Sequence, residues 1–354
     1  MRLLTGYLLR NVLGATGLVL LVLLALAGFI EFVGQLDNTG EGSYSTGGAV
    51  LYTALRLPLL AVEMLPVAAL LGALLGLGSL AGNSELIAMR AAGISAKRLA
   101  VSVSVSGLLL ALVGTTLGEY IAPPLDQFAR KFRSAARSET DRIGQRNTWV
   151  RDGSRIFNVD GIGDRLEFGG FYVFEIDDQQ QLTRIGYANR ADLSVDNEWM
   201  LEDFSETSFE NGLITAEVAD EAVAQYDVDA ELLGIASLRP GSLSLGGLMA
   251  YLDYLEQNKL DSRTYATEFW SRIANIFAII LMPVLAIGFV FGSLRSSGAG
   301  GRLLVGVLIG LAYFLSSRTL ANSGQVFSLD PMIVGLTPML VLAVVTFFAV
   351  NRVR

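Results

Sequence analysis

Residues Leu57 to Ala81 read LPLLAVEMLPVAALLGALLGLGSLA, and Glu63 is the one charged side chain among them. A helix needs about 20 consecutive apolar residues to cross the hydrocarbon core of a bilayer, so this run is long enough to span a membrane. The whole chain of 354 residues is 52% hydrophobic and 17% charged, which is too apolar for one ordinary soluble domain. The stretch and the composition together predict an integral membrane protein.

Five further apolar runs of similar length lie on either side of this stretch. The six predicted spans are Val12–Val33, Leu57–Ala81, Leu99–Gly118, Trp270–Gly292, Arg302–Ala321 and Pro331–Val350. The first run is too long for the apolar region of a signal peptide and lacks a clear cleavage site, so we expect it to be retained. Residues 1–118 and 269–354 are thus predicted to form a membrane α-helical bundle that brackets residues 119–268.

Lysine and arginine are concentrated on one side of the predicted bundle. An even number of spans places both termini on that side, and its short segments carry Arg2, Arg10, Arg90, Lys97, Arg98, Arg295, Arg302, Arg352 and Arg354. The opposite short loops offer little beyond Arg56 and Arg318 near helix ends. The positive-inside rule then predicts cytoplasmic termini, with residues 119–268 outside the cytoplasm.

The segment 119–268 has the composition of a β domain. Short runs typical of strands, among them Arg155–Val159, Phe171–Ile176 and Leu182–Ala188, are separated by turn signals such as Asp152-Gly153, Asp177-Asp178 and Asp196-Asn197. This pattern predicts an inserted antiparallel sandwich or jelly roll. Acidic residues outnumber basic ones about two to one, so the domain as a whole should repel polyanions.

An amphipathic helix is predicted between this domain and the fourth span. Ser244 precedes Leu248, Tyr251, Leu252 and Leu255 at helical spacing. We expect the apolar stripe to pack against the sheet.

The residue inventory excludes several classes of enzyme. The chain has no cysteine and no histidine, which excludes disulfides, histidine metal sites and Ser–His–Asp triads. It also has no GxxxxGK[ST] motif, so a second chain must supply any ATP hydrolysis. An intramembrane hydrolase using Glu63 and a serine would need a nucleophile motif or a metal-ligand cluster, and the sequence shows neither.

A short helix is predicted on the cytoplasmic side, near residues 84–93, in the segment NSELIAMRAAGIS from Asn83 to Ser95. Ser84 is a good N-cap, Glu85 suits the positive end of the helix dipole, and Gly93 is a good C′ residue. Such a helix can dock into a groove on a partner protein. The alternative is that Glu85 only complements the dipole.

A basic cluster follows the third span, where Arg130, Lys131, Arg133 and Arg137 occur together. Arg130, Arg133 and Arg137 are spaced so that a helix projects all three from one face. We expect this to be an outer face on which packing does not require charge. Because arginine forks match phosphate oxygens, the cluster suggests a site for an anionic lipid headgroup. The alternative is a snorkelling or salt-bridged helix end.

Two further features lie within the spans. Glu31 and Glu63 are carboxylates in apolar segments, where such a group usually faces a cavity or a partner, although Glu31 is close enough to the end of its span to reach the interface. The spacing Ala69-xxx-Ala73 and Gly72-xxx-Gly76 predicts a ridge of small residues that lets helices approach closely.

Five passages of the chain resemble the lipopolysaccharide-export permeases of the LptF/LptG type, the paired membrane subunits of an ABC transporter, and resemble the LptG branch most. They are Leu70–Leu80 (LLGALLGLGSL), Ser84–Ser95 (SELIAMRAAGIS), Gly118–Arg133 (GEYIAPPLDQFARKFR), Leu243–Ile273 and Phe291–Arg295 (FGSLR). They occur in order along most of the chain with matching span topology. The resemblance implies a multi-pass protein of the inner membrane of a Gram-negative bacterium, with a periplasmic β-jelly-roll domain.

The same resemblance implies partners and residue roles. The partners would be a paralogous LptF-like permease, a cytoplasmic LptB-like ATPase dimer that uses ATP and Mg, and a bitopic LptC-like protein that continues a periplasmic slide. Glu85 would contact the ATPase, and Arg130 and Arg133 would line the path of the lipid A phosphates. Relatives often place lysines near the outer end of the first span. Here the run is FIEFVGQLDN from Phe29 to Asn38, so Arg56 or Arg318 would have to replace them.

We therefore predict a permease subunit that has no catalytic residues, cofactor or nucleic acid of its own and that moves lipopolysaccharide through a largely aliphatic cavity. Arg130, Lys131, Arg133 and Arg137 are the expected phosphate ligands, Ser84, Glu85 and Gly93 the coupling residues, and Glu31, Arg56, Glu63 and Arg318 possible cavity or gate residues. The rival interpretation is a scaffold protein with no lipid path. The basic patch argues against a scaffold, because an adaptor needs no phosphate ligands.

Overall fold

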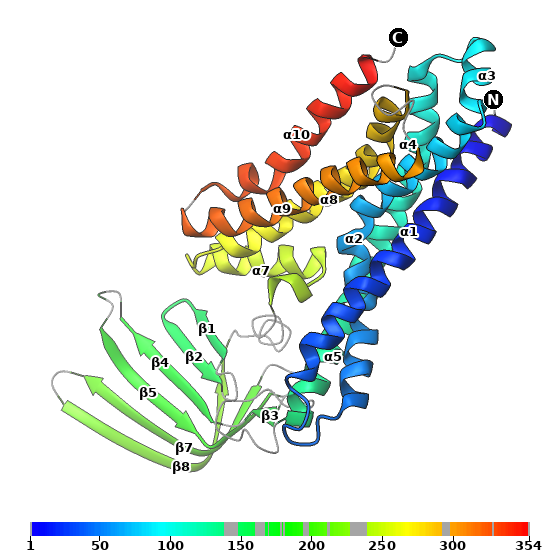
Figure 1. Ribbon diagram of the computed structural model, residues 1–354. Coiled ribbons are helices and arrows are strands. Elements are labelled where there is room, and N and C mark those ends of the chain that lie inside the picture. Colours follow the sequence, from blue (N-terminus) through cyan, green and yellow to red (C-terminus); the bar gives the residue numbers. More distant parts are fainter. Residues whose placement is uncertain are drawn as a thin grey trace. The chain divides into compact units, whose positions relative to one another are not determined.

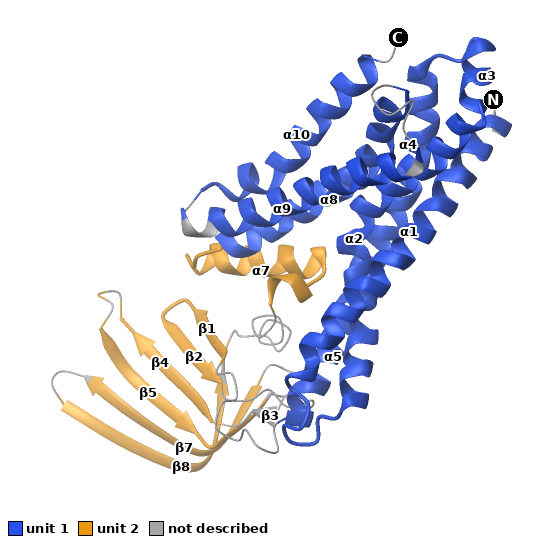
Figure 2. Cartoon of the chain, viewed as in Figure 1, with its two compact units in different colours: residues 1–137, 263–354 blue, residues 138–262 orange. Residues whose placement is uncertain are grey.

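The computed structural model describes residues 2–137, 148–159, 167–168, 170–177, 179, 181–193, 198–210, 213–226, 239–291, 298–327 and 329–352. The predicted turn at Asp196-Asn197, the FGSLR motif beyond Phe291, and Arg354 lie outside these residues. The chain divides into two compact units, which Figure 2 shows in different colours. One unit is Met1–Arg137 with Arg263–Arg354, and the other is Ser138–Ser262.

The first unit contains six helices that are long and apolar enough to cross a membrane, which confirms the six predicted spans. They are α1 (Arg2–Leu36), α2 (Thr46–Gly82), α4 (Ala96–Thr116), α8 (Arg263–Phe291), α9 (Ala299–Val326) and α10 (Pro331–Asn351). A π-helical turn, η1 (Leu117–Ile121), joins α4 to the polar helix α5 (Ala122–Arg137), so the third span continues beyond its apolar part. Both termini lie at the end of this unit that also carries the short helix α3 (Glu85–Ala91) (Figure 1).

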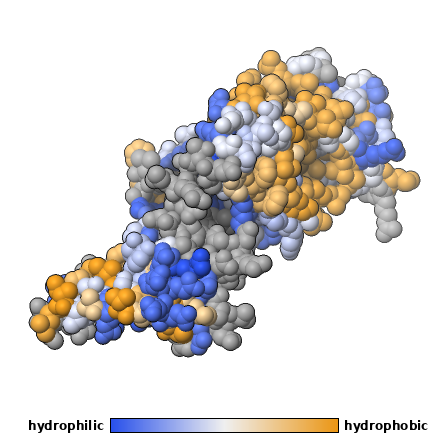
Figure 3. All heavy atoms as spheres, turned by 90° about the horizontal axis from the view of Figure 1, so that it is seen from below, coloured by the Kyte–Doolittle hydropathy of each residue, from blue (hydrophilic) through white to orange (hydrophobic). Residues whose placement is uncertain are grey.

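The core of the helical unit is built around α2 and α8. Leu70, Leu74, Ala278 and Met282 have no exposed surface, and side chains of α1, α4 and α10 join the same cluster. Large apolar side chains on the flanks remain uncovered, as Figure 3 shows in orange, and Leu21 of α1 is 68% exposed. An apolar flank around a packed interior is the arrangement expected of a helix bundle surrounded by lipid.

The ridge of small residues on α2 sets its distance from α1. A Cβ atom on Gly72 would lie 2.3 Å from the Cα of Thr16, and one on Gly76 would lie 2.8 Å from the carbonyl oxygen of Asn11. Ala69 and Ala73 are fully buried beside them. The prediction of close helix approach is therefore confirmed, and α1 packs directly on the backbone of α2.

The second unit is an antiparallel β domain, as predicted. Its strands are β1 (Thr148–Asp152), β2 (Arg155–Val159), β3 (Glu167–Phe168), β4 (Phe171–Ile176), β5 (Leu182–Ala188), β6 (Arg190–Leu193), β7 (Glu198–Glu210) and β8 (Leu213–Gln225). They form one sheet in the order β1-β2-β4-β5-β7-β6-β3, with β8 paired to β7. The strands β2, β4 and β5 coincide with the predicted runs, and the predicted Asp152-Gly153 turn closes the hairpin of β1 and β2.

The core of the β domain is aromatic. Phe157, Phe171 and Trp199 are fully buried, and the rings of Phe171 and Trp199 lie 4.7 Å apart. A short 3₁₀ turn, η2 (Pro240–Ser242), precedes α7 (Leu245–Gln257). On α7 the hydroxyl of Tyr254 donates to the carbonyl oxygen of Arg151 at 2.8 Å. Leu248, Tyr251 and Leu255 are also buried, and the hydrogen bond from Tyr254 ties the amphipathic helix to β1.

The boundaries of the two units differ from the sequence-based limits at residues 118 and 268. The helix α5 belongs to the membrane unit because it packs along α2. The fourth span begins at Arg263 because α8 extends beyond its apolar part. The polar helix ends that hydropathy assigns to the inserted domain therefore belong to the bundle.

Candidate functional site

The predicted basic face of α5 exists, but its arginines make contacts within the bundle, contrary to the expectation of an outer face on which packing does not require charge. Arg130, Arg133 and Arg137 are half-buried, and Lys131 is exposed. Arg130 pairs with Asp126, and Arg137 pairs with Glu41 in the connection between α1 and α2. The salt-bridged helix end, left open as the alternative, therefore describes the local structure. The role of these residues as phosphate ligands stays a prediction.

Asp126 is the centre of this face. Its side chain is 0% exposed. One carboxylate oxygen, Oδ1, accepts from the Nε of Arg56 on α2 at 2.9 Å, and the other, Oδ2, accepts from the Nε of Arg130 at 2.7 Å. A buried carboxylate is tolerated only when it is paired, and here a single carboxylate holds arginines from two helices. Asp126 was not among the predicted site residues, although its i,i+4 spacing to Arg130 signals the pair.

A third helix joins this network through Glu31 of α1. Its Oε1 accepts from the NH1 group of Arg56 and, at 3.2 Å, from the Nε2 group of Gln35. The guanidinium of Arg133 stacks on the ring of Tyr52, with 4.8 Å to the ring centroid, and donates to Gln35 at 3.2 Å. The network thus connects α1, α2 and α5. We call the six residues Glu31, Gln35, Arg56, Asp126, Arg130 and Arg133 the three-helix ion network.

Tyr44, in the connection between α1 and α2, adjoins the same face of α5. Its ring packs beside Phe132 at 6.4 Å between centroids. Burial raises the pKa of the Tyr44 hydroxyl, while the charge of Arg133 acts in the opposite direction. The hydroxyl therefore stays neutral at physiological pH, and it contributes no negative charge beside the arginines.

The second intramembrane carboxylate is also paired. Glu63 of α2 accepts an ion-pair contact from Arg318 of α9 at 2.8 Å, with the two side chains 34% and 56% exposed. The predicted cavity or gate residues were Glu31, Arg56, Glu63 and Arg318. The structure brings them together as two ion pairs, each of which joins α2 to another span.

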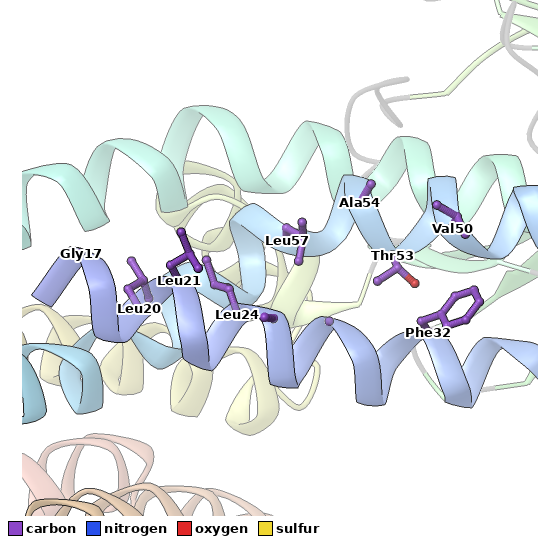
Figure 4. A pocket seen from close by; sticks show the side chains of 11 residues that line it. Gly17, Leu20, Leu21, Leu24, Phe32, Val50, Thr53, Ala54 and Leu57 are labelled. Carbon is purple, nitrogen blue, oxygen red and sulfur yellow. The ribbon is translucent and has the colours of Figure 1, made fainter. Parts of the chain in front are cut away.

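An open apolar groove of about 660 Å³ lies between α1 and α2 (Figure 4). Its lining residues are Gly17, Leu20, Leu21, Leu24, Ala25, Gly28, Phe32, Val50, Thr53, Ala54 and Leu57. The groove lies one helical turn from the three-helix ion network, since its lining residues Gly28, Phe32 and Thr53 precede Glu31, Gln35 and Arg56 by three positions on the same helices. This surface is suited to aliphatic chains, because burial of apolar area stabilises their binding and the lining offers almost no hydrogen-bonding groups.

The short helix α3 spans Glu85–Ala91, as the sequence predicted. Gly93 has φ of +88°, and its N–H and that of Ile94 donate to the carbonyls of Arg90 and Met89, which is a Schellman termination. Ser84 occupies the N-cap position, but its side chain makes no cap hydrogen bond because its φ of 63° is left-handed. The expectation of side-chain capping by Ser84 is therefore wrong.

Glu85 has a contact that the sequence did not indicate. Its Oε2 accepts a hydrogen bond from the hydroxyl of Tyr7 on α1 at 2.7 Å, and both groups lie at an exposed surface. The first and third helices of the chain are therefore joined at the end of the bundle. The Glu85 carboxylate retains further lone pairs for a basic group on a partner, because an ionised carboxylate accepts several hydrogen bonds.

The described residues contain no group of three or more histidine, cysteine, aspartate or glutamate side chains that could hold a metal ion. The acidic residues of the three-helix ion network face arginines. The guanidinium groups of the network are of a kind suited to holding anions.

Comparison with known proteins agrees with the resemblance read from the sequence. The family model described as lipopolysaccharide export system permease LptF/LptG matches residues 6–352. The chain is 32% identical to the lipopolysaccharide export system permease protein LptG of Haemophilus influenzae over 98% of both chains. It is also 32% identical to the protein of the same name from Escherichia coli K12, over 90% of this chain and 89% of that one. The chain belongs to the LptF/LptG family of lipopolysaccharide export permeases.

Proposed function

We propose that this chain is the membrane subunit that extracts lipopolysaccharide from the inner membrane and passes it to a periplasmic bridge toward the outer membrane. The observation that carries the proposal is the family match over residues 6–352, which includes both the spans and the inserted β domain. The chain works beside a paralogous LptF-like permease and a bitopic LptC-like protein. A cytoplasmic LptB-like ATPase dimer hydrolyses ATP with Mg, and the permease itself performs no chemistry.

The charge distribution supports this direction of transport. The cationic short segments favour cytoplasmic termini and a cytoplasmic α3, with the β domain on the periplasmic side. Six apolar helices support a multi-pass location in the inner membrane. The basic face of α5 then lies at the periplasmic end of the bundle, where the headgroup of a lipid of the outer leaflet is found.

The substrate site combines an apolar groove with arginines. Acyl chains occupy aliphatic surface between the helices, and Arg130 and Arg133, with Lys131 and Arg137 beside them, hold the lipid A phosphates. Bidentate guanidinium contacts to phosphate are short and strong, and each contributes about 1.5–3 kcal/mol. ATP binding closes the partner ATPase dimer and, through Glu85 on α3, drives the spans together. Closure of the cavity between the spans then expels the lipid toward the periplasm.

The test is release of lipopolysaccharide from proteoliposomes that contain the complete transporter. Replacing Arg130 and Arg133 together by glutamate should abolish release of native lipopolysaccharide, whereas replacing both by lysine should reduce it less, because charge is kept and only the fork is lost. Because Arg130 pairs with buried Asp126, a glutamate there also places two carboxylates together. The matched control is therefore replacement of both arginines by glutamine, with assembly measured for every variant.

A substrate control separates phosphate binding from packing. Lipid A that lacks phosphates should be released at a low rate that the glutamine variant changes little. Release of native lipopolysaccharide at the wild-type rate by the glutamate variant would show that the arginines are structural. The same would follow if both lipids lost release equally in an assembled complex.

A further inference from the structure

The three-helix ion network contains two carboxylates that differ in their freedom to move. Asp126 is 0% exposed and holds two guanidinium groups through their Nε atoms. Glu31 is 21% exposed and contacts Arg56 through the terminal NH1 group. Moving Asp126 would strip a carboxylate from two partners in the interior, which is costly. Moving Glu31 breaks its contact to Arg56 and its hydrogen bond from Gln35, but Arg56 keeps Asp126 as a partner, so the cost is smaller.

The charges of the network leave a cationic site once Glu31 moves away. Arg56, Arg130 and Arg133 carry three positive charges, and Asp126 removes one. The remaining charge of about +2 matches a phosphate monoester, which carries about −1.5 to −2 at neutral pH. With Glu31 in place the network is closer to neutral. An oxygen of the Glu31 carboxylate accepts from the NH1 group of Arg56, which is a contact that a phosphate oxygen can also make.

We propose that Arg56 of α2 is a further ligand for the phosphate of the lipid, and that Glu31 of α1 is an internal anion that occupies Arg56 until the lipid displaces it. Asp126 is the positioning residue, because its carboxylate holds the guanidinium groups of Arg56 and Arg130 close to each other. The proposal rests on the proposed function and adds to it. It supplies from the second span a cation that the first span lacks in this chain, where residues 29–38 contain no lysine or arginine.

The apolar groove indicates that the anion that displaces Glu31 is the phosphate of a lipid. Gly28 and Thr53, which line the groove, lie three positions before Glu31 and Arg56, so each shares a helix face with one member of the ion pair. A phosphate attached to acyl chains can fill the groove and contact Arg56 at the same time, whereas inorganic phosphate gains only the ionic contact. Loss of the Glu31–Arg56 pair also removes a link between α1 and α2, so binding of the headgroup loosens the first span at that end.

The experiment measures the mole fraction of lipid A that gives half-maximal release from proteoliposomes containing the complete transporter. Glu31→Gln should lower this mole fraction about two- to tenfold, because the internal competitor has lost its charge while the shape is kept. Arg56→Gln should raise it about tenfold or more, since a charge-assisted contact is lost. The double variant should resemble Arg56→Gln, because Glu31 has no competitor role without Arg56.

A purely structural pair predicts a different pattern. Both single variants and the double variant would then shift the mole fraction in the same direction, since each breaks the same contact. Glu268→Gln is the matched control, because Glu268 forms an ion pair of 3.0 Å with Arg272 on α8, outside the network. It should leave the mole fraction unchanged. If Glu31→Gln raises the mole fraction or leaves it at the wild-type value, the proposal is wrong, even where Arg56→Gln fails to assemble.

Two comparisons show whether the bound phosphate belongs to a lipid, and whether a negative result contradicts the proposed function or only the present inference. Lipid A without phosphates should be insensitive to Glu31→Gln, and inorganic phosphate at millimolar concentration should not compete with lipid A. Competition at that concentration would show that the site binds free phosphate and would overturn the lipid assignment. If the wild-type transporter releases both lipids equally, the proposed function of the arginines fails. If it prefers phosphorylated lipid but Glu31→Gln does not tighten binding, only the present inference fails.

Discussion

Removal of the Asp126 carboxylate tests whether the three-helix ion network holds α5 to the bundle. The side chain is 0% exposed and receives two charge-assisted hydrogen bonds, at 2.9 Å from Arg56 and 2.7 Å from Arg130. Each such bond contributes about 1.5–3 kcal/mol, so their sum would be about 3–6 kcal/mol. The side chains of Arg56 and Arg130 are 17% and 25% exposed, so water partly replaces the lost carboxylate as their hydrogen-bond partner. Removal of the carboxylate also relieves its own burial cost. We expect Asp126→Ala to lower the free energy of unfolding by about 2–3 kcal/mol.

The variant Asp126→Asn separates charge from volume. Asparagine fills the same space and keeps one acceptor, but its amide NH₂ faces the donor of one of the two arginines. The loss should therefore approach that of Asp126→Ala without any cavity. The assay is reversible unfolding of the purified complex in mixed detergent micelles, with amide hydrogen exchange reporting on α5. An unfolding free energy of Asp126→Asn within about 0.5 kcal/mol of wild type, the range of an uninvolved surface site, would refute the reasoning.

Three further changes test the ends and the packing of the bundle. Glu85→Ala should reduce co-purification of the ATPase or uncouple ATP hydrolysis from export. The control Tyr7→Phe removes only the internal hydrogen bond to Glu85 and should leave co-purification near the wild-type level. Full ATPase yield and normal lipid-stimulated turnover for Glu85→Ala would remove this residue from coupling. Gly93→Val should weaken the same coupling, because a β-branched residue resists the φ of +88° that ends α3, and an unchanged ATPase yield would contradict this. Gly72→Ala should destabilise the α1–α2 packing by about 1–3 kcal/mol, since its Cβ would lie 2.3 Å from the Thr16 backbone. An unfolding midpoint equal to that of the wild type would show that α1 can move aside without cost.

The parts of the fold that depend on local sequence were predictable. All six spans follow from the length of their apolar runs, and β2 and β4 follow from short runs bounded by turn residues. The ends of helices were not predictable from hydropathy. The helix α2 begins at Thr46, well before the predicted start at Leu57, because residues 46–56 mix apolar side chains with glycine, threonine and Arg56 and so fall outside the continuous apolar run.

The candidate site was predictable only in its residue types. The spacing of Arg130 and Arg133 identified a basic face, but the pairing of Arg56 with Asp126 joins positions 70 residues apart, and no local pattern encodes it. Glu31 was recognised as an intramembrane carboxylate, yet its partner became visible only when α1 and α2 were packed together. Long-range ionic contacts depend on the tertiary arrangement, whereas helix length and strand alternation do not.

Photocrosslinking from the apolar groove in intact cells tests the central claim most directly. A photoreactive residue at Leu24 or Leu57, both of which line the groove, should form an adduct with lipopolysaccharide. The yield of this adduct should fall when the partner ATPase is active and rise when its hydrolysis is blocked. A matched probe at Leu340, which is 55% exposed on α10 and outside the groove, should give little adduct with lipopolysaccharide. Adducts at the groove positions that contain only phospholipid, or that do not respond to ATPase activity, would contradict the account.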